Sequence, residues 1–448
     1  MLGYATVLLT AAALGAEPTP APHVPDALRL ASEPSDQELA WLLWHRSPDL
    51  EAARVRIGTA AAEVERSLLL PNPQAEFNWG TIPVGPTNPA GLDSPLSQIP
   101  NYSIALSTLV EIGKRGPRQE AARHNAQATV LDAIEQLRQR HLDLLGLLGE
   151  IAATEIRIAT LSALAADAQR ITAIQQRRAD KGDVAQLDSD RAALEEQKLL
   201  SNLREQQSHL LEQLRFCADL TGVPCEPFGE GERANAFLER PWPGVPGQAA
   251  GDTTPPLPLE ERPDLQSLRE QERAAQAALR LAHARAIPDP TLRAGYLHDR
   301  FVISGNQRNS LFVGVSLPLT LFDRGQADAR AAEATARGAS RIRTLLLERA
   351  EHELERCTEQ SQALTENRTR LRSTTLPLAR SVVARLEQAV AQGGAPLQEL
   401  LLARRTLGEL LIDATELDLA TFRLSLARAR LGGGGPHALP VTSPPLPR

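Results

Sequence analysis

Few residues in this chain of 448 have the types and spacing that chemistry requires, and each group is incomplete. Gly113-Lys114 looks like the end of a phosphate-binding loop, but Thr108 occupies the position where that loop needs its first glycine. His352-Glu353 has no second histidine at the spacing of a helical zinc site. These two stretches therefore predict neither phosphate binding nor a metal site.

The other candidates are ligands for calcium or for soft metals. Asp188 and Asp190, in the triplet Asp-Ser-Asp, lack the glycine and the further ligands of a calcium loop. The 9 histidines, 3 cysteines and 1 methionine are scattered, which argues against a relay of soft-metal ligands. We therefore predict no catalytic residue, no cofactor and no metal site, and no enzymatic activity.

The cysteines leave two interpretations open. Cys217 and Cys225 lie in the stretch CADLTGVPC, across an expected helix end. They form either a disulfide in an oxidising compartment or two buried thiols. Cys357 falls within an expected helix, where we predict a packed thiol.

The N-terminal residues resemble an export signal. Residues 1–16 contain no charged side chain and end in small residues, although they lack the usual basic start. We expect residues 17–34 to be disordered, and no cysteine near the expected cleavage point could carry a lipid anchor. No run of about 18 apolar residues indicates a transmembrane helix. The net charge of -7 and the interspersed basic and acidic side chains predict no nucleic-acid partner.

The chain contains an internal repeat of about 210 residues. Four landmarks recur in the same order: Pro48-Asp49-Leu50 with Pro263-Asp264-Leu265, Pro71-Asn72-Pro73 with Pro288-Asp289-Pro290, Arg115-Gly116 with Arg324-Gly325, and Gly182 with Gly393. We therefore predict two copies of one unit, at 35–222 and 261–431, with a linker at 223–260 and a disordered tail at 432–448.

Each copy is predicted to run helix, β-hairpin, long helix, shorter helix. A capping box, Ser35 with Glu38, opens the first helical region. The helices before the hairpins end at proline pairs, because proline has no amide donor and forces the preceding residue out of the helical region. The hairpins are expected at 74–112 and 290–321, after Pro71 and Pro73 and after Pro288 and Pro290, and the long helical hairpins at 117–220 and 325–431, with turns at Gly182 and Gly393.

Both hairpins alternate with the period of a strand that has one apolar face. The apolar positions are Tyr102, Ile104, Leu106, Val110 and Ile112 in one and Leu311, Val313, Val315, Leu317, Leu319 and Leu321 in the other, with weaker partners at Ala75, Phe77 and Trp79 and at Leu292, Ala294 and Tyr296. This length and pattern is typical of a transmembrane barrel, which four strands cannot close alone. Alternation also allows a hairpin packed on a soluble core.

The helices favour the barrel. Residues 117–181 and 325–392 contain no internal proline except Pro377, and each would extend on the order of 100 Å as a helix. Residues of the first follow the spacing of a coiled-coil seam, interrupted by His141, which we interpret as a tolerated polar residue. In each copy, the combined length of the two shorter helices is close to the length of the long helix. We therefore predict that the two shorter helices stack end to end beside the long one.

These residues resemble the TolC family of outer membrane efflux ducts. The resemblance covers about residues 35–431 and rests on the stretches LPNPQAEFNWG, IPDPTLRAGY, LSTLVEIGKRGPR and VGVSLPLTLFDRGQADARAA, while KGDVAQLD is similar to the CzcC-like heavy-metal branch. It implies a mainly α fold with a small β part, in which three chains close a twelve-stranded barrel in the outer membrane above a helical barrel in the periplasm. It also implies an inner membrane pump and a periplasmic adaptor as partners, with the cargo left open. The alternative is a soluble periplasmic coiled-coil adaptor or scaffold.

The resemblance further implies an aperture at the helical tips, narrowed by acidic side chains six residues after the turn glycines. Those positions are Asp188 and Glu399, and Asp190 would take part of the role of a further acidic residue. The sequence departs from the family pattern at Arg191, Leu402 and Ala395. The alternative for Asp188 and Glu399 is a position in the first helical turn, where a carboxylate interacts with the helix dipole.

Overall fold

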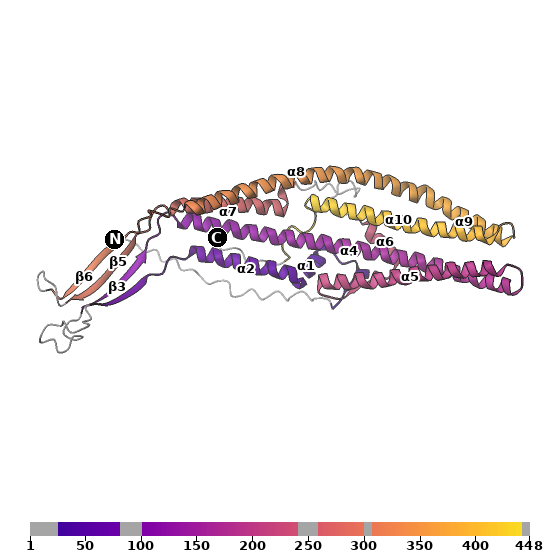
Figure 1. The fold of residues 1–448 in the computed structure, drawn as a ribbon, viewed down its shortest axis with the longest axis horizontal. Helices are drawn as coiled ribbons and strands as arrows, with labels where there is room; N and C mark the ends of the chain where they lie inside the picture. The colour runs from indigo at the N-terminus through magenta and orange to yellow at the C-terminus, as the bar shows by residue number, and fades with distance from the viewer. Residues whose placement is uncertain (1–25, 81–100, 241–258, 300–306, 441–448) are drawn as a thin grey trace, which may run out of the picture.

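The computed structural model describes residues 26–80, 101–240, 259–299 and 307–440, and it forms an elongated bundle of helices with a small sheet at one end (Figure 1). Residues 1–25, which include the expected signal segment 1–16, and residues 81–100, 241–258, 300–306 and 441–448 lie outside the described part. No helix in the described part is both long and apolar enough to cross a membrane.

Both halves of the chain contain a helix, two strands, a long helical stretch and a shorter helix in the same order, and each half has further short elements of its own. The first half contains β1 (Leu28–Arg29), a 3-10 turn (Leu30–Ser32), α1 (Asp36–Arg46), α2 (Pro48–Leu68), β2 (Gln74–Gly80), β3 (Asn101–Leu109), α4 (Arg115–Asp180) and α5 (Gln186–Thr221). Between the halves lie β4 (Cys225–Glu226), α6 (Gly231–Glu239) and a 3-10 turn (Leu259–Glu261). The second half contains α7 (Pro263–Ala284), β5 (Thr291–Asp299), β6 (Asn309–Ser316), α8 (Gln326–Arg370), a π-helical turn (Leu371–Thr375), α9 (Leu376–Ala391) and α10 (Leu397–Leu431).

Shorter helices line the long ones as predicted. α2 and α5 follow one another beside α4, and α7 and α10 follow one another beside α8 and α9 (Figure 1). α7 and α10 also contact α4, so the two halves share one bundle. The turns at Gly182 and Gly393 lie together at the end of the bundle that is far from the sheet.

The starts of the helices confirm two local predictions. The Ser35 hydroxyl accepts the Glu38 amide at 3.3 Å, and the Glu38 carboxylate accepts the Ser35 amide at 2.8 Å, which completes the capping box. Pro48 and Pro263 occupy first-turn positions, where the missing amide donor costs no helical bond.

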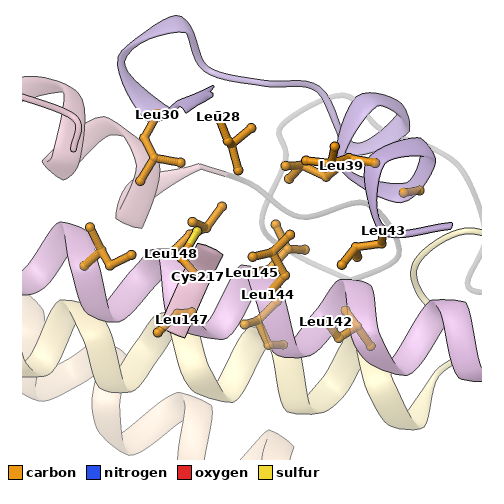
Figure 2. Packing of buried hydrophobic residues seen from close by; sticks show 14 of the residues in the cluster. Leu28, Leu30, Leu39, Leu43, Leu142, Leu144, Leu145, Leu147, Leu148 and Cys217 are labelled. Atoms are coloured by element: carbon orange, nitrogen blue, oxygen red, sulfur yellow. The ribbon is translucent and has the colours of Figure 1, made fainter. Parts of the chain in front are cut away.

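The core lies around the middle of α4. Leu137, Leu144, Leu148 and Ile151 are fully buried, and His141, at the interrupted seam position, is also buried. Figure 2 shows leucines of the N-terminal segment and of α1 lying over those of α4. α4 is apolar on several faces at this level because α1, α5, α6 and α10 surround it.

The second long helix is not continuous. The π-helical turn ends just before Pro377, which has no amide to donate to the carbonyl four residues earlier. A π turn changes the bonding pattern at such a break while keeping the helical direction. The single helix expected over 325–392 is therefore two helices, α8 and α9, joined by this turn.

Three segments expected to lack structure are partly ordered. Within 17–34, Leu28 pairs with Cys225 in a short parallel ladder, and Leu30 is fully buried. Within the expected linker 223–260, Phe228 is buried and its amide donates to the Glu155 carboxylate at 2.8 Å, while α6 packs on α4 and α10. Burial of these scattered apolar side chains in the core offsets the entropy of ordering them.

The described part of the tail, to residue 440, is ordered by a buried arginine. Arg138 has no exposed surface, and it pairs with Glu135 at 2.7 Å. It also donates to the carbonyls of Arg430 at 3.1 Å and Gly434 at 3.2 Å. A buried guanidinium needs such acceptors, and the Gly434 carbonyl holds this part of the tail against α4, while the Arg430 carbonyl belongs to the end of α10. The expectation of disorder for 432–448 is therefore wrong as far as residue 440.

Cys217 and Cys225 are joined by a disulfide across the end of α5. Gly222, in the left-handed conformation, turns the chain between them. The disulfide holds β4 beside the helix, so that β4 presents its edge to β1. Cys357 is a buried free thiol in α8.

Two glycines on α4 test how closely α10 packs against it. A methyl group at Gly149 would lie 2.4 Å from the buried ring of Phe422, whereas one at Gly146 would meet only Leu426 at 3.8 Å. We expect Gly149→Ala to lower the free energy of unfolding by about 1–2 kcal/mol through overpacking. Gly146→Ala should raise it by up to about 1 kcal/mol through helix propensity. Thermal unfolding followed by circular dichroism should show midpoints that move in opposite directions; equal shifts would contradict this packing.

Candidate membrane face and helical tip

The four long strands form one antiparallel sheet in the order β2-β3-β5-β6. The sequence predicts two separate hairpins, and the structure joins them through β3 and β5 along nine residue pairs. The strands end earlier than expected, at Leu109 and Ser316. β6 ends there because its last partner, Thr291, is the first residue of β5 after Pro290, and Pro318 lacks an amide donor.

The register places the predicted apolar positions on one face of this sheet. Phe77 pairs with Ile104, Ile104 with Tyr296, and Tyr296 with Leu311, so that one row crosses all four strands. This face is open to solvent in the single chain. Its exposed fractions are Phe77 64%, Ile104 55%, Leu106 58%, Leu292 44%, Leu311 84%, Val313 84% and Val315 67%.

The opposite face carries small and polar residues. Ala105 and Ser107 are almost fully buried on it. Gly295 lies opposite Ala105, and a side chain there would lie 2.5 Å from the Ile104 carbonyl. Because Gly295 has no side chain, β5 can approach β3 closely at this point. The side chains on this face are therefore smaller, as well as more polar, than those on the apolar face.

A row of three aromatic residues with polar groups and one asparagine borders the apolar face at the end far from the helices. Trp79, Tyr102, His298 and Asn309 are neighbours across the four strands. The Tyr102 and His298 rings stack at 4.9 Å between centroids. Aromatic residues with a polar group are typical of the boundary between a membrane and water.

The proline pairs create unpaired carbonyls where helix becomes strand. Pro71 and Pro73 cannot donate to the carbonyls of Ser67 and Leu69, four residues earlier. Arg118 replaces both donors, through Nε to Ser67 at 3.4 Å and Nη2 to Leu69 at 3.3 Å. A residue after the hairpin thus completes the helix before it.

The second copy solves the same problem with a different residue. Pro290 cannot donate to the Ala286 carbonyl, and the Thr320 hydroxyl bonds to it at 3.1 Å. Asp289, between the prolines, pairs with Lys114 at 2.6 Å and accepts the Ile112 amide at 2.9 Å, which links the two junctions. Burial raises the pKa of Asp289, but the hydrogen bonds from Lys114 and Ile112 outweigh it and leave the pKa below its usual value.

At the other end of the bundle, the two tips contact each other. Gly182 and Gly393 both have left-handed backbones, with φ of 78° and 73°, so both turns require glycine. Asp188 Oδ1 accepts a hydrogen bond from Gln398 Nε2 at 3.1 Å. The same oxygen lies 3.8 Å from Nη1 of Arg191. The contact with Gln398 brings the first turn of α5 to the first turn of α10.

The three acidic residues of the expected aperture have different surroundings. Glu399 is exposed and follows Gln398 directly. Asp190 is exposed and accepts a hydrogen bond from Gln186 at 3.0 Å within its own helix. The N-cap residues of α5 and α10, Ala185 and Pro396, provide no side-chain cap, and Asp188 and Glu399 each lie in the first turn of their helix.

Sequence reasoning missed Arg118, Thr320 and Gln398. The signal for Arg118 and Thr320 was the proline pair itself, because each proline leaves a carbonyl that needs a donor. No local pattern marks Gln398, whose role comes from the approach of the two tips. Among the described residues, no group of three or more His, Cys, Asp or Glu side chains is placed to hold a metal ion.

Removing the Arg118 side chain should weaken the junction. Arg118→Met would leave the Ser67 and Leu69 carbonyls and the Glu111 carboxylate without their donor, and we expect the free energy of unfolding to fall by about 2 kcal/mol or more. Arg115→Met, which removes one bond to the Leu68 carbonyl, is the matched control and should cost about 1 kcal/mol or less. Thermal unfolding would measure both; equal effects would show that Arg118 does not complete the helix.

Comparisons with known proteins agree with this geometry at the level of the fold. No family model matches the sequence, and no curated protein matches it as a relative. The solved structure of CusC matches with a TM-score of 0.69 and 16% identity, over 89% of this chain and 92% of that one. The outer membrane protein VceC of Vibrio cholerae matches with a TM-score of 0.67 and 18% identity, over 89% and 96%.

A third similar structure is the CmeC outer membrane channel of Campylobacter jejuni, with a TM-score of 0.68 and 14% identity over 90% of this chain and 87% of that one. The matches do not distinguish the CzcC-like branch from others. The chain therefore has the fold of outer membrane channels of the TolC family, as the resemblance of its sequence predicted.

Proposed function

We propose that this protein is the outer membrane exit duct of a tripartite efflux system, through which substrates pass passively from the periplasm to the outside. The observation that carries the proposal is the exposed apolar face of the four-stranded sheet, opposite a face of small and polar residues. Water penalises so large an exposed apolar surface, whereas lipid does not. A soluble adaptor would have to cover this face with protein.

The edges of the sheet support a trimer. β2 and β6 are the edge strands, and strand edges within a lipid bilayer need hydrogen-bonding partners. Pairing β6 of one copy with β2 of the next leaves no edge when the ring closes, and three copies supply the twelve strands that the TolC resemblance implies. At about 3.4 Å per residue, the eight residues of β6 extend about 27 Å along the strand. At the tilt of about 40° that such barrels have, this covers about 20 Å of their apolar band of about 25 Å.

The helices then continue the passage into the periplasm. Partners at the far end would be a periplasmic adaptor and an inner membrane pump, as the fold implies. The shared fold with channel structures supports this arrangement, since the chain covers nearly the whole length of CusC and VceC. No side-chain set in the described residues identifies a cargo, which such a duct receives from its pump.

The tip carboxylates form the aperture in this proposal. With three copies, Asp188 and Glu399 supply six carboxylates around one axis, and Asp190 adds three more nearby. A ring of carboxylates at a narrow opening attracts cations. The contact of Asp188 with Gln398 and Arg191 holds part of this charge in place.

The lipid-facing surface can be tested with two neighbouring residues of β6. Val313 lies on the apolar face, and Gly314 lies on the opposite face with open space around its Cα. Val313→Glu should cost about 1–2 kcal/mol per chain in the bilayer and reduce the amount of trimer in the outer membrane. Gly314→Glu, at the same depth with the same charge, should insert normally. Detergent extraction of membrane fractions measures both; equal insertion would reject the proposed orientation.

The aperture can be tested by neutralising its charge. We expect Asp188→Ala with Glu399→Ala to lower the cation preference of single channels, because the fixed charge at the opening is removed. Asp188→Asn with Glu399→Gln keeps the hydrogen-bond acceptors and should lower the preference equally. The reversal potential in a salt gradient measures both. If it does not change, the two residues act only within their first helical turns.

A further inference from the structure

A cluster of four residues on the polar face of the sheet is drawn from all four strands. Glu76 lies on β2, Ser107 on β3, Arg293 on β5 and Phe312 on β6. Arg293 Nη2 lies 2.6 Å from Glu76 Oε2, and the Ser107 hydroxyl donates to the other oxygen of Glu76 at 3.1 Å. The Arg293 guanidinium carbon lies 5.5 Å from the centre of the Phe312 ring.

The contacts hold the charged groups of Glu76 and Arg293 in place on the polar face of the sheet. Ser107 and Arg293 are direct neighbours in the register, so the ion pair crosses β3 from β5 to β2. Phe312 supports the guanidinium through a cation–π contact, and Ser107 supports the carboxylate. Both charged side chains are about one third exposed, at 37% for Arg293 and 36% for Glu76. They are therefore accessible to water on the face that the proposed duct uses as its lumen.

Stability alone does not explain this pair. Ion pairs with this degree of exposure contribute little to folding. Next to the pair, the polar face carries the small residues Ala105, Gly295 and Gly314, and a further charged residue of this face, Asp299, lies at the far end of β5. Two opposite charges within hydrogen-bonding distance cancel each other beyond about a Debye length, roughly 8 Å at physiological salt. The pair therefore adds charged groups to the wall without adding net charge.

We propose that Glu76 and Arg293 form a charge-balanced ring inside the barrel, which keeps the duct from selecting ions by charge at the level of this pair. The inference rests on the proposed function, because three copies are needed to place three such pairs around one lumen. The charge of each residue would then affect the permeation of ions, but the opposite charge of its partner compensates for that effect.

Single-channel recordings of the purified full-length protein in planar bilayers test the ring, with potassium chloride at two concentrations. Arg293→Gln leaves Glu76 unpaired and should shift the reversal potential toward cation preference. Glu76→Gln leaves Arg293 unpaired and should shift it toward anion preference. The double variant Glu76→Gln with Arg293→Gln should return to the wild-type value. The series is repeated in a protein that also carries Asp188→Asn and Glu399→Gln. This removes the contribution of the tip carboxylates to the reversal potential, so that the contribution of the barrel residues can be measured.

The sign of the shifts separates charge from damage to the fold. Loosening of the barrel would move both single variants in the same direction, and that result, or no shift in either, would overturn the inference. If one single variant does not assemble, the reversed pair Glu76→Arg with Arg293→Glu should show wild-type selectivity, and a marked shift would again overturn it. Wild-type protein that forms no channel at all would instead reject the proposed function.

Discussion

The structure depends on converting a helix into a strand, once in each half, without leaving backbone groups unpaired. The proline pairs follow α2 and the turn after α7, and they remove the amides that would have bonded to the last carbonyls. Arg118 and Thr320 restore those bonds from residues that follow the hairpins. Each hairpin is therefore closed at its base by a side-chain contact, and both hairpins leave the bundle at the same end, where they form one sheet.

The sheet that extends from this base has two different faces. Strand alternation places Ile104 and Leu311 on one side, and Ser107 and Gly295 on the other. The apolar side is exposed in the single chain, and β2 and β6 are the edge strands of the sheet in the described residues. A closed ring of copies, with lipid outside and water inside, would cover the apolar side with lipid and pair the edge strands of neighbouring copies. The same ring brings the tips together on its axis, where their carboxylates become neighbours.

Local patterns in the sequence predicted the local features of the fold. The proline pairs, the capping box and the alternation around Val313 each depend on residues within a few positions, and the repeat made the predictions of the proline pairs and of the alternation twice. Contacts between distant residues were not predictable in this way. The pairing of Leu28 with Cys225 and the burial of Arg138 against the Gly434 carbonyl join segments that carry no periodic pattern. For the same reason the acidic tip residues were found by resemblance, whereas their partner Gln398 was not.

The central claim is that the polar face of the sheet encloses a water-filled passage and the apolar face meets lipid. Electron cryomicroscopy of the protein extracted in detergent would test it most directly. The account predicts three copies around one continuous lumen, lined by Ser107 and Gly295, with Leu311 and Val313 inside the detergent belt. A structure in which this apolar face packs against protein, with no lumen through the assembly, would contradict it.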